Sequence, residues 1–322
     1  DAPATFHLVP FVGHYLNSVL GLDMPVGDAD SVRAATYTIR NALVLRDAIG
    51  GSRRRRPLDT YFKGVQWMVA RSSEAEDALV LAVKGGHNGE NHNHNDLGHF
   101  IVHLDGVSYF MDIGRPVFTR ASFTGDRYSI LANSSRGHSV PAINGVEQGF
   151  GRAFAARVAN RSVGEVSSIE YDLVRAYPEE AGLAAFTRRC ELDRTGLARV
   201  TVRDRLELRD EGEVVHCYYC SVRPVPTEDG FVLRSDRGAV AVSLERRAGC
   251  DAPGDRADAD GDDPGGARVV ALDDAGNGEP AYRIECMQTG RWFEAGRVLR
   301  VLDGRGTGHL AGKGQASLLC RP

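Results

Sequence analysis

Histidine and carboxylate side chains are concentrated in residues 89–100, which read GENHNHNDLGHF. His92 and His94 are two positions apart, and Asp96 follows at the same interval. In an extended backbone, residues i and i+2 project from one face, so we expect these three side chains to point together. Imidazole nitrogens and carboxylate oxygens are the ligands of tetrahedral zinc sites. The spacing favours a metal site, and its remaining ligands must come from elsewhere in the chain.

Asp112 is a candidate ligand, because the Asp-Gly turn at residues 105–106 returns the chain toward the histidines. The register of this hairpin decides whether Asp112 can join them. A strict two-residue turn pairs Leu104 with Val107 and places Asp112 on the face away from His94. A bulge in the turn, or an equivalent kink nearer His94, brings Asp112 to the same face. A metal site therefore predicts such a bulge or kink.

His138, in the loop NSSRGHSVPAING, is the natural third ligand. A lone histidine is usually satisfied by ordinary hydrogen bonds in the core or at the surface. Five of the ten histidines, however, fall within residues 87–103, and this density favours a functional cluster. His99 and His103 fit ordinary strand positions. No partner is visible in the sequence for the remaining histidines, which are His7, His14, His216 and His309.

The composition is that of a soluble globular protein, with 42% hydrophobic and 25% charged residues and a net charge of −4. No apolar run approaches the roughly 20 residues of a membrane-spanning helix. The negative charge argues against a general nucleic-acid surface. A local basic cleft for an anionic ligand is nevertheless compatible with five arginines in the middle of the chain, and solvated surface arginines are the alternative. They are Arg115, Arg120, Arg127, Arg136 and Arg152. Localisation stays open between secreted, periplasmic and cytoplasmic.

Six cysteines in 322 residues do not make a disulfide scaffold. Cys217 and Cys220 are spaced like half of a zinc knuckle, but they lie in a strand-like stretch, EVVHCYYCSV. Positions i and i+3 of a strand point to opposite faces. We therefore expect these cysteines to be buried small residues.

The pattern of apolar residues changes near Trp67. Residues 1–58 are predicted to be a helical segment ending in a basic linker, SRRRRPLD, because apolar positions recur every three or four residues. From Trp67 onward, short alternating stretches such as ALVLAVK and ARVTVRDRLELR are separated by Gly, Asp, Asn and Pro. We expect a mainly β domain over residues 59–322, a large antiparallel β-sandwich of two packed sheets. Residues 250–268, rich in Asp, Gly and Pro, are expected to form a mobile loop.

Three ordered motifs within residues 84–148 carry a family resemblance. They are KGGHNGENHNHNDLGHFIVHLDG, MDIG, and FTGDRYSILANSSRGHSVPAINGVEQ. Together they resemble the C-terminal β-sandwich region of heparinase II/III-like polysaccharide lyases. Full-length relatives in that family carry an N-terminal α/α toroid, of which residues 1–50 would be only the last helices. The resemblance implies a polysaccharide lyase, or the sandwich part of one.

The resemblance also implies roles for individual residues. The metal ligands would be His94, Asp112 and His138, with zinc the usual occupant and a mainly structural role. His92 matches a histidine that faces substrate, and Tyr128 matches a tyrosine near the sugar. The family's usual Asn after the last histidine is here Ser139, which leaves substrate contacts at that position open.

The chemistry expected of such a site is β-elimination from a uronate-containing polysaccharide, such as a glycosaminoglycan or alginate. A base removes the proton beside the carboxylate, and neutralisation of that carboxylate stabilises the intermediate. The expected catalytic residues are His92 and Tyr128, and the expected substrate-binding residues are Asn91, Arg115, Arg127 and Arg136.

Two alternatives remain from the sequence. One is a non-catalytic carbohydrate-binding or scaffold module that keeps the metal. The other is a metal-dependent hydrolase, which needs an open coordination position and a base such as Glu90 or Asp96. The expected partner is an anionic polysaccharide or oligosaccharide in each lyase or binding case, and a homodimer stays open.

Overall fold

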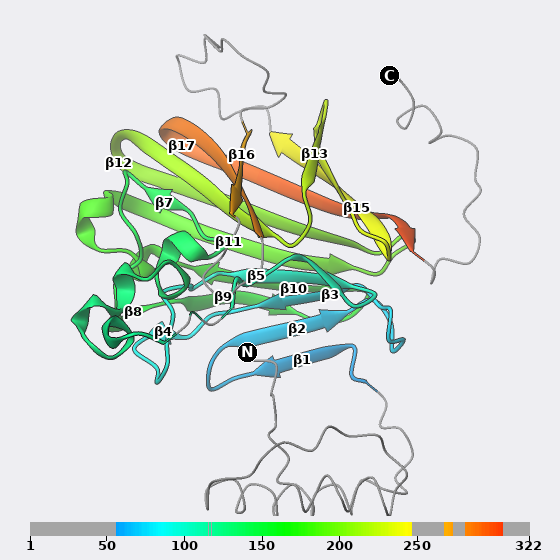
Figure 1. Cartoon of the computed structure of the whole chain (residues 1–322), viewed down its shortest axis with the longest axis horizontal. Coiled ribbons are helices and arrows are strands. Elements are labelled where there is room, and N and C mark those ends of the chain that lie inside the picture. The colour runs from blue at the N-terminus through cyan, green and yellow to red at the C-terminus, as the bar shows by residue number, and fades with distance from the viewer. Residues whose placement is uncertain (1–55, 115, 117, 247–266, 273–280, 305–322) are drawn as a thin grey trace, which may run out of the picture. The chain divides into compact units, whose positions relative to one another are not determined.

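The computed structural model describes residues 56–114, 116, 118–246, 267–272 and 281–304 (Figure 1). The chain divides into two compact units, residues 1–56 and 57–322. The predicted helical segment lies almost wholly outside the described residues, as does most of the predicted loop at 250–268. The last two residues of that predicted loop, Ala267 and Arg268, are instead the first two residues of a strand. None of the described helices is long and apolar enough to cross a membrane.

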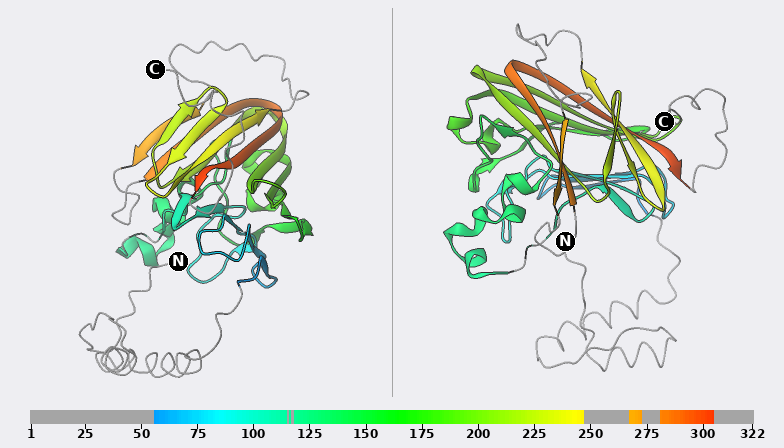
Figure 2. Two further views of the ribbon diagram at one scale, coloured as in Figure 1. Left: turned by 90° about the vertical axis from the view of Figure 1, so that its right-hand side faces the viewer. Right: turned by 45° about the horizontal axis from the view of Figure 1, so that its top comes forward.

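The described part of the second unit is built from antiparallel strands in two layers (Figures 1 and 2). One layer contains β1 (Asp59–Phe62), β2 (Trp67–Arg71), β3 (Val80–Val83), β5 (Phe100–Leu104) and β6 (Val107–Phe110). The other contains β9 (Arg157–Ser162), β10 (Val166–Asp172), β11 (Leu183–Asp193), β12 (Arg199–Cys220), β17 (Ala281–Gly304), β15 (Gly238–Arg246), β14 (Gly230–Arg234) and β13 (Pro224–Thr227). The predicted mainly β fold is confirmed.

Smaller elements complete the described chain. Strand β7 (Ala142–Ile143) pairs with β12, β16 (Ala267–Leu272) pairs with β17, and β4 (His87–Asn88) pairs with β8 (Gly151–Ala155) in a separate two-stranded sheet. Six short 3-10 helices lie in the connections: η1 (Arg120–Phe123), η2 (Gly125–Ser129), η3 (Leu131–Asn133), η4 (Ser135–Gly137), η5 (Val174–Ala176) and η6 (Glu179–Ala181). Four of these, η1 to η4, follow one another between β6 and β7.

The two layers are hydrogen-bonded to each other, a connection that was not predicted. Phe110 at the end of β6 pairs with Cys220 at the end of β12, so that one sheet of 15 described strands folds back over itself. Its interior is apolar from both sides: Phe100 and Phe110 lie with ring centroids 5.5 Å apart, and Tyr218 of the opposite layer lies 6.1 and 6.0 Å from them. This shared core fixes β5 and β6, the hairpin on which Asp112 depends.

Several predicted strands have different limits in the structure. The stretches 198–209 and 213–222, predicted as two strands, are one long strand, β12, with a register shift between Glu207 and Gly212. Polar exposed residues at 210–211 imitate a turn there, yet the ladder with β17 continues on both sides. The short strands β1 and β13 were not predicted. Both lie at the ends of the sheet path, where a strand needs little apolar sequence because only one side is paired.

Cys217 and Cys220 are buried and form no disulfide, as predicted. Burial raises the pKa of the Cys217 thiol to about 12. A thiol that stays protonated is a poor metal ligand and a poor nucleophile. The half-knuckle spacing is therefore part of the core packing.

Candidate metal centre and substrate face

The turn between β5 and β6 is a strict two-residue turn. Asp105 and Gly106 both have left-handed backbone conformations, with φ of 44° and 80°, and Leu104 pairs with Val107. Two successive positive φ values are those of the turn that best matches the twist of a β-hairpin. If this register continued, Asp112 would face away from His94.

A bulge corrects the register one step further along. Val102 pairs with Phe110 while His103 pairs with Ser108, so that Tyr109 is the extra residue on β6. The shift by one residue changes the face to which everything beyond Phe110 belongs. This is the kink nearer His94 that a metal site predicted. It directs Asp112 toward residues 89–99, which we call the histidine loop.

The three predicted ligands meet in space. One ligand atom from each of His94, Asp112 and His138 lies within 4.8 Å of the other two. The rings of His94 and His138 are 5.3 Å apart between centroids. The residues come from the loop before β5, the end of the β6 segment and the loop after η4. Two imidazoles and a carboxylate make a donor set that suits zinc.

His138 shows why a cation fits at this point. Its Nε2 lies 3.0 Å from the carbonyl oxygen of Ala132, which can only accept, so Nε2 carries the proton. The lone pair of Nδ1 then faces Oδ2 of Asp112 at 3.4 Å, and Nδ1 has no hydrogen-bond partner among the described residues. Two acceptors facing each other in a buried place repel, unless a proton or a metal ion lies between them.

The ionisation of the triad agrees with this arrangement. Burial disfavours the charged form of His138, but Asp112 outweighs it and raises the pKa of His138. Burial likewise opposes ionisation of Asp112, yet His138 and His99 hold the pKa of that carboxyl well below its usual range. Burial and the neighbouring His138 lower the pKa of His94 to about 4, so His94 is neutral near pH 7, the form that binds metals.

His99 belongs to this cluster, and its prediction as an ordinary strand position is wrong. It lies just before β5 with 3% of its surface exposed. Its Nδ1 accepts a hydrogen bond of 2.9 Å from the backbone N–H of Ser139, and its Nε2 is 3.7 Å from Oδ2 of Asp112. Burial lowers the pKa of His99 to about 4. No spacing rule in the sequence distinguishes it from His103, which lies on β5 and contacts Ser108.

The predicted strand through His92, His94 and Asp96 is absent. Residues 89–99 form turns, and His92 has a left-handed φ of 58°, so the rule that i and i+2 share a face does not apply. Asp96 is buried in an ion pair with Nζ of Lys84 and does not join the triad. What brings the ligands together is loop geometry rather than strand alternation.

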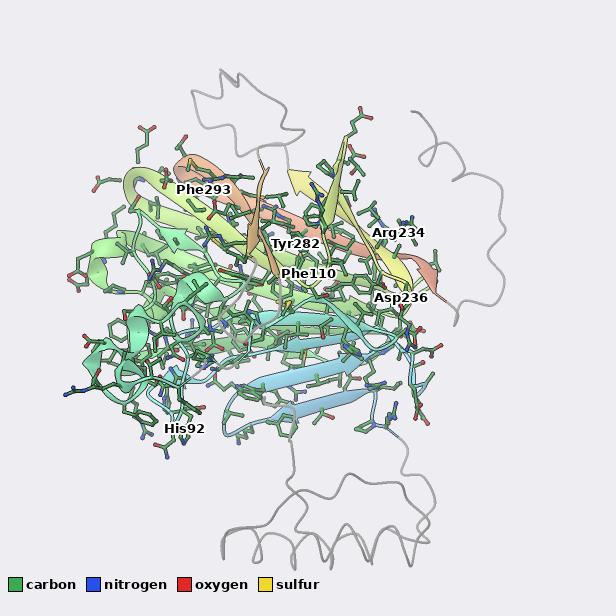
Figure 3. All side chains as sticks on the ribbon, in the orientation of Figure 1. His92, Phe110, Arg234, Asp236, Tyr282 and Phe293 are labelled. Atoms are coloured by element: carbon green, nitrogen blue, oxygen red, sulfur yellow. The ribbon has the colours of Figure 1, made fainter. Side chains whose placement is uncertain are left out.

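His92 and Asn91 are both exposed in this loop. Figure 3 shows His92 at the edge of the molecule. The loop is attached to η2, because Nη2 of Arg127 donates to the carbonyl oxygen of Asn93. Tyr128 is the next residue of η2 after Arg127. The two predicted catalytic residues, His92 and Tyr128, therefore lie on segments that contact each other. We call the exposed surface of these segments the substrate face.

An exposed aromatic residue that was not predicted adjoins Tyr128. Phe150, 66% exposed, stacks on the Tyr128 ring with centroids 5.2 Å apart and 21° between the planes. The guanidinium of Arg127 also lies 5.7 Å from the centroid of the Tyr128 ring. A large exposed aromatic ring beside cationic groups is a feature of ligand-binding surfaces. Phe150 follows no motif in the sequence, and only its exposure in the fold distinguishes it.

The predicted substrate-binding arginines have different environments. Arg127 is committed in part to Asn93 and Tyr128. Arg136 is 55% exposed and forms an ion pair of 2.7 Å with Glu147, which offsets its charge. Arg115 lies outside the described residues. Arg152, which was predicted only as part of a possible basic cleft, lies on β8 and is exposed.

A buried glutamine, Gln148, is hydrogen-bonded to the backbone of the histidine loop. The side chain of Gln148 donates to the carbonyl of Leu97 at 2.8 Å and accepts from the N–H of the same residue at 2.9 Å. Its Oε1 also accepts from the Asn88 side chain at 3.3 Å. Both backbone groups of Leu97 are thus satisfied outside any strand. Gln148 immediately precedes Gly149 and Phe150 in the chain and so links the histidine loop to Phe150.

A buried arginine, which was not predicted, provides the second anchor. Arg188 on β11 forms a bidentate pair with Asp204 on β12, at 2.6 and 2.7 Å. Burial opposes the charge of Asp204, but Arg188 holds the pKa of that carboxyl below its usual range. The Nη1 group of Arg188 donates to the carbonyls of Gly98 at 3.0 Å and Ser139 at 2.7 Å. Ser139 is fully buried, so this departure from the family motif does not face substrate.

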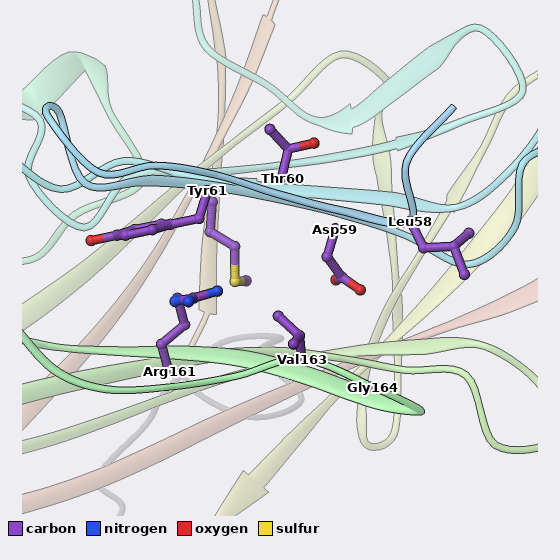
Figure 4. Close-up of a pocket in the computed structure, with 8 residues that line it drawn as sticks. Leu58, Asp59, Thr60, Tyr61, Arg161, Val163 and Gly164 are labelled. Atoms are coloured by element: carbon purple, nitrogen blue, oxygen red, sulfur yellow. The ribbon is translucent and has the colours of Figure 1, made fainter. Parts of the chain in front are cut away.

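A cavity of about 560 Å³ lies elsewhere, at the edges of β1 and β9 (Figure 4). The guanidinium of Arg161 stacks over Tyr61 at 4.6 Å, and Asp59 pairs with Arg194 at 2.9 Å. The lining residues are Leu58, Asp59, Thr60, Tyr61, Met68, Arg161, Val163 and Gly164. None of them belongs to the triad or the substrate face.

Comparison with solved structures finds the same fold in proteins named heparan sulfate lyase and heparinase III. A mutant of heparan sulfate lyase HepC from Pedobacter heparinus matches with a TM-score of 0.59 at 14% identity, covering 94% of this chain and 43% of that one. HepC itself gives 0.59 at 15%, covering 84% and 41%. A structure of heparinase III gives 0.56 at 13%, covering 79% and 38%. This chain therefore spans less than half the length of these proteins.

No curated protein matches the sequence. The model of the family described as "Heparinase II/III-like, C-terminal" matches residues 54–265. That range includes the three sequence motifs, the triad and the substrate face. The chain accordingly belongs to the heparinase II/III-like C-terminal family.

Proposed function

We propose that this chain is a polysaccharide lyase, or the sandwich part of one, that cleaves a uronate-containing polysaccharide by β-elimination. The observation that carries the proposal is the meeting of His94, Asp112 and His138, because His94 lies two residues after the exposed His92 in the same loop. The family and the names of the structural neighbours, which are heparan sulfate lyases, support the reaction class and an anionic polysaccharide as substrate.

The triad is proposed to hold a zinc ion with a structural role. His94 offers a neutral imidazole, His138 offers Nδ1, and Asp112 offers Oδ2. When bound, the ion supplies a positive charge that joins three loops which the sheets alone do not connect. The benefit to the reaction is indirect, because the same loop that carries His94 carries His92 two residues earlier.

In the proposed reaction the imidazole of His92 takes the C5 proton of a uronate residue. The electron pair left at C5 forms the double bond between C4 and C5, and the bond from C4 to the bridging oxygen breaks. The phenol of Tyr128 gives a proton to that leaving oxygen. Positioned acid and base groups of this kind contribute typically 10²- to 10⁴-fold. The uronate carboxylate must be neutralised for the C5 proton to become acidic, and a preorganised donor is worth about 3 kcal/mol. Asn91, Arg127 and Arg136 have suitable donors.

A second function has a specific observation in its favour. The chain spans less than half of each matched lyase, and the stacked pair of Phe150 and Tyr128 is a surface on which a sugar ring can pack. A carbohydrate-binding module in which the metal has only a structural role would need no more than this aromatic surface. The hydrolase alternative loses one of its two candidate bases, because Asp96 is engaged by Lys84.

The test is an absorbance assay for the unsaturated uronate product, with heparan sulfate, heparin and alginate as substrates. We expect product formation that falls by at least 10²-fold in His92→Ala and Tyr128→Phe. Tyr61→Phe, in the cavity between β1 and β9, is the matched control for a tyrosine change. Saccharide binding without product from any substrate would favour the binding module, and neither binding nor product would refute both functions.

A further inference from the structure

His99 lies between a backbone hydrogen-bond donor and a carboxylate, and each of them faces a different nitrogen of its ring. On one side the backbone N–H of Ser139 points at Nδ1 from 2.9 Å. On the other side Oδ2 of Asp112 faces Nε2 from 3.7 Å, and Nε2 has no hydrogen-bond partner among the described residues. The ring is 3% exposed, so water does not decide its protonation.

The Ser139 contact fixes the tautomer of His99. A backbone N–H can only donate, so Nδ1 must present its lone pair, and the ring proton must be on Nε2. An Nε2 that carries a proton has no free lone pair in the ring plane. His99 is therefore unsuited to be a fourth metal ligand, although its ring lies 5.2 Å from that of His138. It is suited to donate a hydrogen bond.

The acceptor placed to receive that hydrogen bond is Asp112, whose Oδ2 lies 3.7 Å from Nε2. Its Oδ1 already accepts from the backbone N–H of Gly114 at 2.6 Å, which leaves Oδ2 as the free end of the carboxylate. A carboxylate oxygen has two lone pairs, so Oδ2 can accept from His99 and bind a cation at the same time. Donors on both oxygens would hold the carboxylate plane in one orientation.

We propose that His99 is the positioning residue of the metal centre: its Nε2–H orients Asp112, while its Nδ1 holds Ser139, the residue after the ligand His138. One ring thereby couples two ligands that are 26 positions apart in the sequence, Asp112 and His138. This inference rests on the metal site proposed above. It assigns to His99 a role outside the ligand set.

Two substitutions separate the two ends of the ring. In His99→Asn, the amide oxygen lies near the place of Nδ1 and keeps an acceptor for Ser139, but the donor toward Asp112 is lost. In His99→Gln, the amide N–H₂ reaches the place of Nε2 and keeps that donor, but the acceptor for Ser139 is lost. Both variants are of similar polarity, which makes each the control for the other.

The measurement is zinc affinity of the full chain by competition with a chromogenic chelator. Loss of an outer-shell partner typically costs 10- to 100-fold in metal affinity. We expect that loss in His99→Asn and a change of only a few-fold in His99→Gln. Equal affinities of wild type and His99→Asn would overturn the inference. Failure of the wild type to bind zinc would instead refute the metal site itself.

Two further readouts keep the proposal testable if a variant folds poorly. Long-range ¹H–¹⁵N spectra of the wild-type protein should show the His99 proton on Nε2, and a proton on Nδ1 would contradict the assignment. The absorption spectrum of the cobalt-substituted protein should keep its intensity in His99→Gln and in His99→Asn at saturating cobalt. A change in coordination number in either variant would make His99 a ligand and overturn its positioning role.

Discussion

Arg188 and Asp204 form a bidentate ion pair inside the sandwich, and the one guanidinium nitrogen that this pair leaves free binds a carbonyl from each of two metal-site loops. Gly98 directly precedes His99, and Ser139 directly follows His138. A single side chain on β11 therefore holds the spacing between the two loops. Both side chains are almost fully buried, at 1% and 2% exposure, so little solvent screens the interaction.

Removing one partner of this pair should be strongly destabilising. We expect Arg188→Met to lower the free energy of unfolding by about 3–5 kcal/mol, because Asp204 would be left as an uncompensated buried charge. Zinc affinity should fall with it, since two loop carbonyls lose their donor. Chemical denaturation and chelator competition measure the two effects. Arg205→Met is the control, because Arg205 is 63% exposed in its pair with Glu294 and such pairs contribute about 0–1 kcal/mol.

The triad should be required for metal content. We expect Asp112→Asn and His138→Ala to purify with little zinc, because each removes one of three protein ligands. Elemental analysis after dialysis against a weak chelator provides the measurement. His103→Gln is the matched control, since His103 lies on the neighbouring strand and contacts Ser108 rather than the triad. Undiminished zinc in Asp112→Asn would exclude that residue as a ligand.

The sequence was sufficient to predict this triad but not the route by which it forms. The Asp-Gly dipeptide predicted the two-residue turn, and the metal site required a later shift in register, which Tyr109 provides. Alternation of apolar residues places β5 and β6 because both lie against the common core. The His-x-His spacing was misleading: it imitates a strand, whereas Gly98 with φ of 85° and His92 with φ of 58° make it a loop.

Arg188 and His99 were beyond the reach of sequence reasoning for a common physical reason. Each contacts the loops of the triad through backbone groups: Arg188 binds the carbonyls of Gly98 and Ser139, and His99 binds the N–H of Ser139. A backbone carbonyl or N–H has no identity in the sequence. Arg188 is also 90 positions from Gly98, a separation that only the packed layers bring together.

Zinc binding should release a proton and weaken in acid. Burial opposes protonation of His138, but Asp112 raises its pKa above the ordinary 6.5, so below that raised pKa the ion must displace a proton. We expect the affinity to fall about tenfold per pH unit in that range. His94 does not contribute above pH 6.5, because its pKa is lowered to about 4. Calorimetry in buffers of different ionisation enthalpy counts the protons, and a release of none would contradict the sign of this shift.

Zinc affinity should fall as pH falls, whereas the stability of the metal-free protein should fall as pH rises. A histidine whose folded pKa is raised contributes stability below its unfolded pKa, and this contribution is lost as pH rises through the folded pKa. The His138–Asp112 pair therefore weakens in the metal-free protein at alkaline pH, while the zinc-loaded protein keeps its ion. The difference in Tm between the two forms should widen as pH rises above 6.5. A constant difference would mean that His138 carries no proton in the metal-free state.

Phe150 should contribute to saccharide binding. We expect Phe150→Ala to weaken oligosaccharide binding about 2- to 13-fold, because an aromatic contact is worth about 0.5–1.5 kcal/mol. Titration with a size-defined uronate oligosaccharide measures the affinity. Phe123→Ala is the control: Phe123 is 78% exposed but stacks on Phe118 rather than on Tyr128. Equal losses in the two variants would indicate a general effect of surface aromatics and remove Phe150 from the substrate face.

Gly89 should be intolerant of any side chain. A Cβ at this position would lie 2.5 Å from the backbone nitrogen of Arg152, where β8 runs beside the histidine loop. Backbone atoms on a paired strand cannot move away cheaply, so Gly89→Ala must push the loop with His92 out of place. We expect product formation or saccharide binding to fall while the zinc content, which depends on residues beyond His92, changes less. Gly125→Ala is the control, because nothing lies within 4 Å of its added Cβ. Wild-type behaviour in Gly89→Ala would show that the close approach of β8 does not position this loop.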